Sequence, residues 1–510
     1  MLSFPRRRES SIKFNGFILI RKDIWIPASA GMTKNGMNTF INQLDFSNIL
    51  KKALENGGDY ADIFIEVSQP TSVTLEDNKI ERFVSGKDMG AGVRVIFEGK
   101  TAYAYSNEIS DNSFLELASV VNKAVNPVRG KTSNGVNGDK RNAVFNLRKK
   151  NPKTDFKIEL YPYDVDTDKK AEIVIRANNF ARAIDKRVRQ VIATYGDRIQ
   201  QVWIANSEGD LVEDLRVYTL ATVHVVTADG DIIQTGYEPI GGLIGFEIFD
   251  SSPIENVAEI ATRRAVMMLE AKRAPGGLIP VVISSDAGGT MIHEAIGHGL
   301  EADLAQQGLS VYSNKIGEII ASPLITVVDD ATLPNKRGSF RFDDEGVESE
   351  RTVLVEKGVL KNYMYDRLTA MKDGKRSTGN GRRESYHKRP IPRMTNTLIE
   401  PGNMDPAEIL RSVDKGLFIK KMGGGQVNTV NGDFVFEVNE GYLIEKGKIG
   451  DPVRGATLTG NGPKILKMID MVGNDLGFSI GTCGKDGQGV PVSDAMPTLR
   501  IPEIIVGGKV

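Results

Sequence analysis

The sequence predicts an α+β protein with largely antiparallel sheets and flanking helices, in which an amino-terminal α/β region precedes a β-rich carboxy-terminal domain. Three observations support this fold class. Apolar residues recur at helical spacing in the amino-terminal half, alternating residues and short turns indicate hairpins along the chain, and glycines and hairpins become denser beyond residue 274. With 510 residues, 40% hydrophobic and 26% charged, the chain can bury a sizeable core.

Residues 1–36 are interpreted as an extension outside the folded core. Their apolar residues are interrupted by Arg21, Lys22 and Asp23, so the stretch lacks the unbroken apolar segment of ~7–15 residues that a signal peptide needs. The segment resembles a translated bacterial repeat element. We therefore expect the folded protein to start near Met37.

Two α+β subdomains are expected next, over residues 37–128 and 154–273. In the first, "GVRVIFEGKTAYAY" alternates and turns at Glu98-Gly99, which predicts a hairpin. The stretch after Asn126, rich in Gly, Asn and Lys, indicates a linker over 129–153. Three helices are predicted from apolar faces, which consist of Phe114, Leu117, Ala118, Val121 and Val125, of Ile173, Ala177, Phe180, Ala181 and Ile184, and of Ile254, Val257, Ala258, Ala261, Ala265, Met268 and Leu269.

A β-rich block over 188–249, with a turn at "NSEGD", is predicted between the last two helices. The sequence "RAPGG" then marks a boundary, and residues 274–510 are expected to form the carboxy-terminal domain. Its hairpins include "TVLVEKGVLKNYMY" and "FVFEVNEGYLIEKGK". The stretch "LIPVVISSDAGGT" predicts a buried strand, a turn and the start of a helix.

The charge balance and the cysteine count limit the possible partners and location. Lysine and arginine total 65 against 66 acidic residues, so the net charge indicates neither nucleic acid nor a membrane as a partner. The single cysteine excludes an intramolecular disulfide and suits a reducing compartment. No apolar run approaches the ~20 residues needed to span a bilayer. We expect the protein to be cytoplasmic.

The stretch "HEAIGHGLEAD" contains two of the four histidines, His293 and His298, with Glu294 directly after the first. Zinc peptidases use H-E-x-x-H, in which both histidines share a helix face and the glutamate activates water. Residues five apart on a regular helix diverge by about 140°, at ~3.6 residues per turn. A π-turn would return both to one face, and Gly297 and Gly299 would let the backbone distort or end there. Two histidines packed on a helix for structural reasons are the alternative.

A catalytic zinc usually has three protein ligands, so a third must come from elsewhere. Glu301 and Asp303 are either further ligands or solvated helix residues. Cys483, in the glycine-rich "GFSIGTCGKDGQGVPV", offers a thiolate on a tight loop. It could instead be an inert buried residue, or a nucleophile with His298 or His387 as its base.

Two other stretches each have a functional and a structural interpretation. The stretch "NGRRESYHKRPIPRM" contains Arg382, Arg383, Tyr386 and His387. These residues could bind a substrate carboxylate or stabilise an oxyanion. Alternatively, their charges are solvated or paired with acidic residues of a neighbouring domain or subunit. The glycines at 423–425 could allow a peptide to approach closely as an added strand, or form an ordinary loop. His224, within an alternating strand pattern, is expected to be structural.

"HEAIGHGLEAD", "NGRRESYHKRPIPRMTN" and "GTCGKDGQGVPV" resemble, in order and spacing, segments of the TldD/PmbA family of bacterial metallopeptidases, specifically the TldD side. The resemblance covers nearly everything after Met37. It implies a zinc site with His293, His298 and Cys483 as ligands, with Glu294 as the catalytic residue. It also implies a peptidase for unfolded proteins or short peptides that works with an inactive PmbA/TldE-like homologue, in which 274–510 is the metallopeptidase domain.

Two other functions remain possible from the sequence. A cysteine hydrolase built on Cys483 would leave the paired histidines unexplained. A noncatalytic peptide-binding subunit would leave Glu294 unexplained. The metal content of the purified protein separates the zinc peptidase from both.

Overall fold

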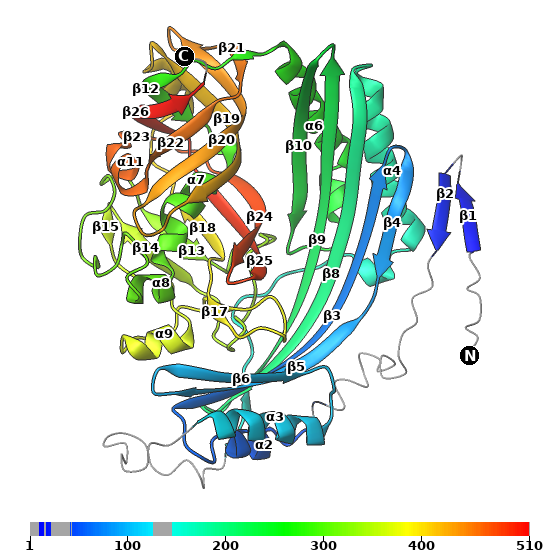
Figure 1. Ribbon diagram of the computed structural model, residues 1–510, viewed down its shortest axis with the longest axis vertical. Coiled ribbons are helices and arrows are strands. Elements are labelled where there is room, and N and C mark those ends of the chain that lie inside the picture. Colours follow the sequence, from blue (N-terminus) through cyan, green and yellow to red (C-terminus); the bar gives the residue numbers. More distant parts are fainter. Residues whose placement is uncertain (1–9, 15–16, 22–40, 42, 126–144, 509–510) are drawn as a thin grey trace.

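The computed structural model describes residues 10–14, 17–21, 41, 43–125 and 145–508. These residues form an α+β fold with largely antiparallel sheets and flanking helices, which confirms the predicted fold class (Figure 1). Two eight-stranded sheets and one six-stranded sheet account for most of the strands. The first eight-stranded sheet belongs to the amino-terminal half, and the other two large sheets lie beside it in the carboxy-terminal half (Figure 1).

The first sheet contains the longest strands, in the order β10-β9-β8-β3-β5-β6, with β4 paired to β3 and β7 to β9. Strands from both predicted subdomains pair within it, since β3 runs antiparallel to β8 from Asp62 to Glu76. The division into subdomains at 37–128 and 154–273 therefore stays a prediction. The strands are β3 (Tyr60–Glu76), β4 (Lys79–Ser85), β5 (Asp88–Phe97), β6 (Lys100–Ser106), β7 (Arg148–Lys149), β8 (Val188–Asn206), β9 (Asp210–Asp229) and β10 (Ile232–Gly242).

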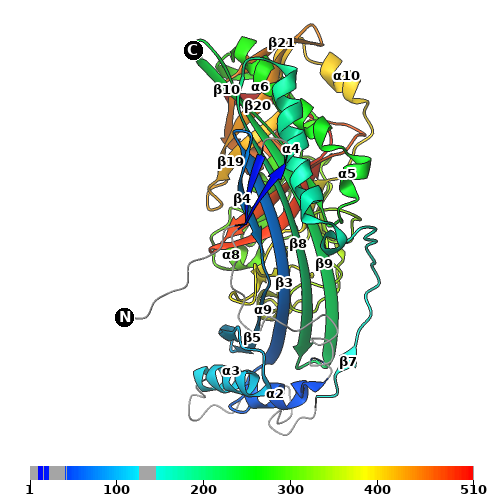
Figure 2. The ribbon, with the colours of Figure 1, turned by 90° about the vertical axis from the view of Figure 1, so that its right-hand side faces the viewer.

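Helices cover this sheet at two levels, with α2 and α3 at one end and α4 and α6 along the other part (Figures 1 and 2). The predicted faces of α3 and α6 are buried throughout. The predicted face of α4 is partly wrong, because Phe180 is 38% exposed and Val174 is buried in its place. The helices are α2 (Phe46–Ala53), α3 (Asp111–Ala124), η3 (Pro162–Asp164), α4 (Thr167–Ile184), α5 (Ile248–Ser251) and α6 (Ile254–Glu270).

Gly236 lets β10 pack directly on the backbone of α6. A Cβ atom at this position would lie 1.9 Å from the carbonyl oxygen of Ala261. We expect Gly236→Ala to lower the free energy of unfolding by about 1–3 kcal/mol, since the strand or helix must shift. The measurement is the urea midpoint of the full chain. Gly86→Ala is the control, because no atom lies within 4 Å of its added Cβ; an equal loss there would contradict the packing argument.

The second sheet closes into a barrel. Its order is β11-β21-β20-β19-β12-β26-β22, and the additional pairing of β20 with β22 completes the ring. Phe436, Leu458 and Ile504 are among the residues that fill its interior. The strands are β11 (Lys272–Arg273), β12 (Gly277–Ile283), β19 (Lys415–Val427), β20 (Asp433–Glu445), β21 (Lys448–Arg454), β22 (Thr457–Asn461), β23 (Met471–Val472) and β26 (Leu499–Gly507).

The third sheet has the order β15-β14-β13-β18-β25-β24 and packs next to the barrel (Figure 1). Both hairpins predicted in this half are present, with turns at Lys357-Gly358 and Lys446-Gly447. Its strands are β13 (Val327–Asp330), β14 (Arg351–Glu356), β15 (Val359–Leu360), β18 (Asn396–Ile399), β24 (Gly477–Lys485) and β25 (Gln488–Met496). A separate two-stranded sheet consists of β16 (Gly381–Arg382) and β17 (Ile391–Pro392). Helix α9 (Arg367–Lys372) lies in the same half, whereas α10 (Pro406–Arg411) and α11 (Gly462–Met468) pack against strands of the second sheet.

Two predicted segments fall largely outside the described residues. Within the predicted extension 1–36, β1 (Ser10–Phe14) and β2 (Phe17–Arg21) form a separate two-stranded sheet, a hairpin that was not predicted. The centre of the predicted linker lies outside the described residues, and its end supplies β7. No helix within the described part of the chain is both long and apolar enough to cross a membrane.

Candidate metal centre

The histidine motif follows a buried strand and a tight turn, as predicted. Strand β12 leads through η4 (Ser285–Ala287) into α7 (Thr290–Ile292), which continues as the π-helix His293–Gly297. The backbone N–H of His298 donates to the carbonyl of His293, five residues earlier. The predicted π-turn is confirmed. It brings the two imidazoles together, with ring centroids 5.0 Å apart and planes at 89°.

The two glycines of the motif have a different role from the predicted one. Gly297 has an ordinary helical φ of −54°, so it does not relieve backbone strain. A Cβ at Gly297 would instead lie 2.2 Å from Sδ of Met394, and one at Gly299 would lie 2.7 Å from the ring of Tyr312. Close packing of the motif against its neighbours therefore explains both glycines.

Cys483 reaches the histidines from the third sheet. It lies on β24, which forms a hairpin with β25 across a turn at Asp486 and Gly487, both with positive φ. An Asp-Gly pair suits such a turn. Cys483 is 4% exposed, and its backbone carbonyl accepts a hydrogen bond of 2.5 Å from the buried Arg393.

The candidate ligand atoms of His293, His298 and Cys483 lie within 4.8 Å of one another. Cys483 Sγ is 3.5 Å from Nε2 of His298. Two ligands of a tetrahedral zinc, with bonds of ~2.0–2.3 Å, lie ~3.5 Å apart. Among the residues that the structure describes, this is the one group of three His, Cys, Asp or Glu side chains placed to hold a metal ion.

A carboxylate lies behind each histidine. Glu301 Oε2 is 3.0 Å from Nδ1 of His298, and Asp494 Oδ2 is 3.5 Å from Nδ1 of His293. Metal-binding histidines usually present their other ring nitrogen to such a partner, which fixes the ring's orientation and tautomer. The donor set and its surroundings therefore fit a zinc ion held by His293, His298 and Cys483.

Glu301 is neither solvated nor grouped with the candidate ligands, so both sequence interpretations of it are wrong. Its side chain is fully buried, and Lys485 Nζ lies 3.1 Å from Oε2. Burial opposes the charged form, but Lys485, His298 and Arg393 outweigh it and lower the pKa of Glu301 to about 2. Asp303 is likewise paired, with Lys485 at 2.7 Å. Lys485, two residues after Cys483, thus connects the strand carrying the thiol to the carboxylate behind His298.

The thiol and the glutamate of the motif have shifted ionisation. Burial raises the pKa of Cys483, but hydrogen bonds and charges from the two histidines outweigh it and lower the pKa to about 5. Burial raises the pKa of Glu294, against the opposing effect of both imidazoles. Glu294 lines a cavity of about 460 Å³ together with the three candidate ligands, Gly425, Gln426 and Val427.

Arg382 and Arg383 of the basic stretch after Asn380 do not line this cavity. Arg382 donates to the carbonyls of Met394 and Pro491, and the backbone N–H of Arg383 donates to Asp344. Both arginines are buried, so they are not solvated. Arg383 instead pairs with an acidic residue of the amino-terminal half, the other predicted alternative, since its guanidinium lies 3.9 Å from Asp62.

Two aromatic residues of that stretch and His224 also lie away from the cavity. The backbone N–H of Tyr386 donates to Glu66 on β3. His387 packs on Tyr386 and Tyr105, away from Cys483, which removes it as a base for that thiol. His224 lies on β9 opposite Ile192 and Tyr237.

The glycines at 423–425 belong to β19 and not to a loop. The register with β20 is irregular between Met422 and Gly425. Beyond Ile419, β12 no longer pairs with β19, so this edge has no strand partner among the described residues. Gly425 faces the metal cavity along that edge.

Comparison with known families covers most of the described chain. Residues 276–508 match the PmbA/TldA metallopeptidase C-terminal domain, residues 160–269 the central domain and residues 61–126 domain 1. The Metalloprotease TldD homolog of Haemophilus influenzae is 40% identical over 463 residues, which is 88% of this chain and 93% of that protein.

Two further similarities concern the metal and the fold. The Zinc metalloprotease TldD homolog of Saccharolobus solfataricus is 28% identical over 464 residues, 90% of this chain and 99% of that protein. The crystal structure of TldE from Thermococcus kodakarensis has a TM-score of 0.72 at 19% identity, covering 90% of this chain and 99% of that one. The latter likeness concerns the fold alone.

Proposed function

Because the chain belongs to the PmbA/TldD family of metallopeptidases, we propose that it is a zinc-dependent peptidase for unfolded proteins or short peptides. In this proposal the zinc ligands are His293, His298 and Cys483, and Glu294 is the catalytic residue. The observation that carries the proposal is the convergence of two imidazoles and one thiol within 4.8 Å, on a cavity that Glu294 also lines.

A zinc ion bound there would lower the pKa of a bound water to about 7 and polarise a substrate carbonyl. Glu294, next to the ligands, takes a proton from the attacking water and returns it to the leaving amine. Glu301 is hydrogen-bonded to Nδ1 of His298, and Asp494 lies 3.5 Å from Nδ1 of His293, so Nε2 of each ring is left for the metal.

The free edge of β19 supports an extended binding mode. Near Gly425, β19 pairs with β20 on one side only. Its other edge lies at the cavity and has no strand partner among the described residues. A substrate that adds there as a strand is bound through its backbone, which makes recognition tolerant of sequence. A folded protein has few free backbone groups to offer. This mode therefore suits unfolded chains and short peptides.

The partner of the chain is proposed from its relatives. The chain carries the intact H-E-x-x-x-H motif of the TldD side, and its fold matches that of a TldE. We infer that it works with an inactive PmbA/TldE-like subunit.

The proposal is tested with one protein substrate in two states. The zinc-loaded chain, with and without its homologous subunit, is offered the substrate either folded or reduced and unfolded. We expect cleavage of the unfolded form, loss of cleavage after chelation and recovery when zinc is returned. Equal cleavage of both forms would contradict the substrate class, and chelation without effect would contradict the metal.

Glu301 is expected to act as a positioning residue for His298. Glu301→Gln removes the charge that faces His298, Lys485 and Arg393 while keeping a similar shape. We expect zinc affinity, measured by chelator competition, to fall about 10–100-fold. The absorption spectrum of the cobalt-substituted protein should also change. Asp303→Asn is the control, since Asp303 contacts Lys485 and not a histidine; an equal loss of affinity in both variants would contradict the positioning role.

A further inference from the structure

An exposed apolar row crosses the outer face of the barrel, formed by side chains from four neighbouring strands. Val435 on β20 is opposite Thr459 on β22, which is opposite Ile505 on β26, which is opposite Leu278 on β12. Directly opposed residues place their side chains on the same face of a sheet. Val435, Ile505 and Leu278 are 48%, 53% and 60% exposed, so the row lies at the surface.

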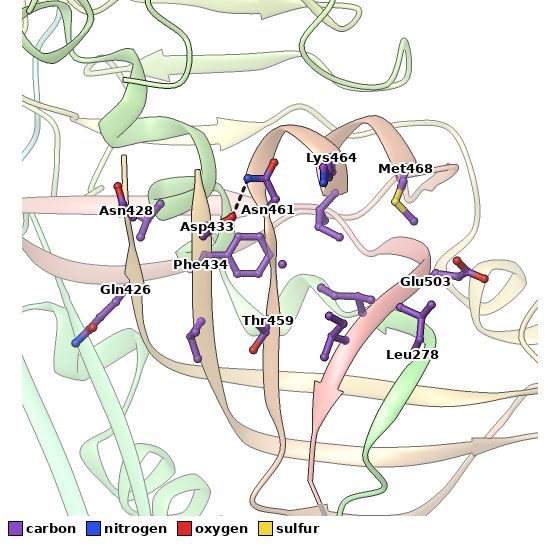
Figure 3. A pocket seen from close by; sticks show the side chains of 16 residues that line it. Leu278, Gln426, Asn428, Asp433, Phe434, Thr459, Asn461, Lys464, Met468 and Glu503 are labelled. Carbon is purple, nitrogen blue, oxygen red and sulfur yellow. Dashed lines mark hydrogen bonds between the residues drawn. The ribbon is translucent and has the colours of Figure 1, made fainter. Parts of the chain in front are cut away.

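The row forms the floor of a groove of about 770 Å³, which we call the barrel groove (Figure 3). Helix α11 borders it through Lys464 and Met468, and Gln426 and Leu278 lie at its two ends (Figure 3). Exposed apolar side chains that line a groove are a common feature of binding sites.

The barrel groove and the metal cavity have two lining residues in common. Gln426 and Val427, near the end of β19, line both of them. Gln426 also extends the apolar row, because it is opposite Val435 in the sheet. A polypeptide that leaves the metal cavity past Gln426 therefore enters the groove.

We infer that the barrel groove binds apolar side chains of an extended substrate polypeptide, several residues away from the bond that is cleaved. This inference rests on the proposed peptidase function and adds a substrate preference to it. Apolar side chains are exposed in an unfolded chain and buried in a folded one. The groove thus gives the enzyme a second way to select unfolded polypeptides, through side chains instead of the backbone.

The geometry sets the length of substrate that reaches the groove. Four strand spacings of ~4.8 Å separate Gln426 from Leu278, which is roughly 19 Å. An extended chain advances ~3.3 Å per residue, so about six residues beyond the metal cavity span the row. A peptide of four residues in total does not reach its far end.

The test compares labelled peptides that differ only far from the cleavage site. Two twelve-residue peptides share a central segment and carry either Leu and Val or Ser and Gln at both ends, and a four-residue peptide contains the centre alone. Binding is measured by fluorescence anisotropy with the full-length Glu294→Gln protein, which binds without cleaving. We expect the apolar peptide to bind about tenfold more tightly than the polar one, as for partial burial of two apolar side chains.

Substitutions in the groove identify where this preference arises. Val435→Thr combined with Ile505→Thr keeps β-branched residues in both strands, and should abolish the preference without changing binding of the four-residue peptide. Ile233→Thr, at a 62% exposed position on β10, is the matched control and should keep the preference. Thermal melts establish that each variant is folded.

Three results would overturn the inference. The first is equal binding of the apolar and polar peptides, and the second is an equal loss of the apolar preference in Ile233→Thr. The third is that the Val435→Thr and Ile505→Thr substitutions instead reduce binding of a second subunit, measured by light scattering. The last result would make the groove a subunit interface. Failure of the wild-type chain to cleave any of these peptides would contradict the proposed function, whereas the binding comparison concerns the groove alone.

Discussion

The Glu294→Gln variant is expected to keep its zinc and lose most of its turnover, by about 10²–10⁴-fold in kcat. The amide has the size of the carboxylate but cannot accept a proton from water. Glu294 is not one of the three converging donors, so the metal should stay bound. The measurements are the zinc content and the kcat for a short peptide.

Glu318→Gln is a suitable control, because Glu318 is exposed and does not line the metal cavity. It should retain wild-type turnover. If Glu294→Gln kept full turnover, the assignment of Glu294 as catalytic residue would be wrong. If it lost zinc together with activity, Glu294 would have to be treated as a ligand.

The Cys483→Ser variant is expected to lose both zinc and activity. A neutral hydroxyl is a much poorer zinc ligand than the thiolate that the low pKa of Cys483 provides. The loss of zinc affinity should exceed the ~10–100-fold loss that is typical when a residue hydrogen-bonded to a metal ligand is replaced, as in Glu301→Gln. Chelator competition and peptide hydrolysis at saturating zinc measure the two effects.

This variant also separates the metallopeptidase from a cysteine hydrolase. The 3.5 Å contact between Cys483 and His298 would suit a thiol nucleophile as well as a pair of ligands. If Cys483→Ser kept its zinc but lost activity, and an acyl-enzyme could be trapped on the native thiol, the cysteine hydrolase would be the correct account.

The fold class and the convergence of the three candidate ligands were predictable because their signals are local or singular. The five-residue spacing of His293 and His298 required a π-turn for a shared ligand role, and the structure contains one. Cys483 is the only cysteine, so there was one candidate thiolate to pair with them. Helical periodicity likewise predicted the buried faces of α3 and α6.

The surroundings of the site were not predictable in the same way. Asp494 reaches His293 because α7 packs against β25, a contact that no spacing in the histidine motif indicates. The spacing did indicate two other neighbours of the site. Glu301 comes three residues after His298, a separation at which helical side chains lie close together. Lys485 comes two residues after Cys483, a separation at which strand side chains point to the same face. Without the tertiary structure, however, neither could be distinguished from a solvated charge.

The basic stretch shows the same limit. Arg383 is buried because β3, β5 and the carboxy-terminal half meet around it, with its guanidinium 4.1 Å from the centre of the Phe64 ring. Sequence spacing carries no information about a contact across more than three hundred residues.

The central claim is that His293, His298 and Cys483 hold one zinc ion. X-ray absorption at the zinc edge, combined with elemental analysis of the full-length protein, tests it most directly. We expect about one zinc per chain, with nitrogen or oxygen neighbours at ~2.0–2.1 Å and one sulfur at ~2.3 Å that disappears in Cys483→Ser. A protein that binds no stoichiometric zinc, or a zinc shell without sulfur, would contradict the account.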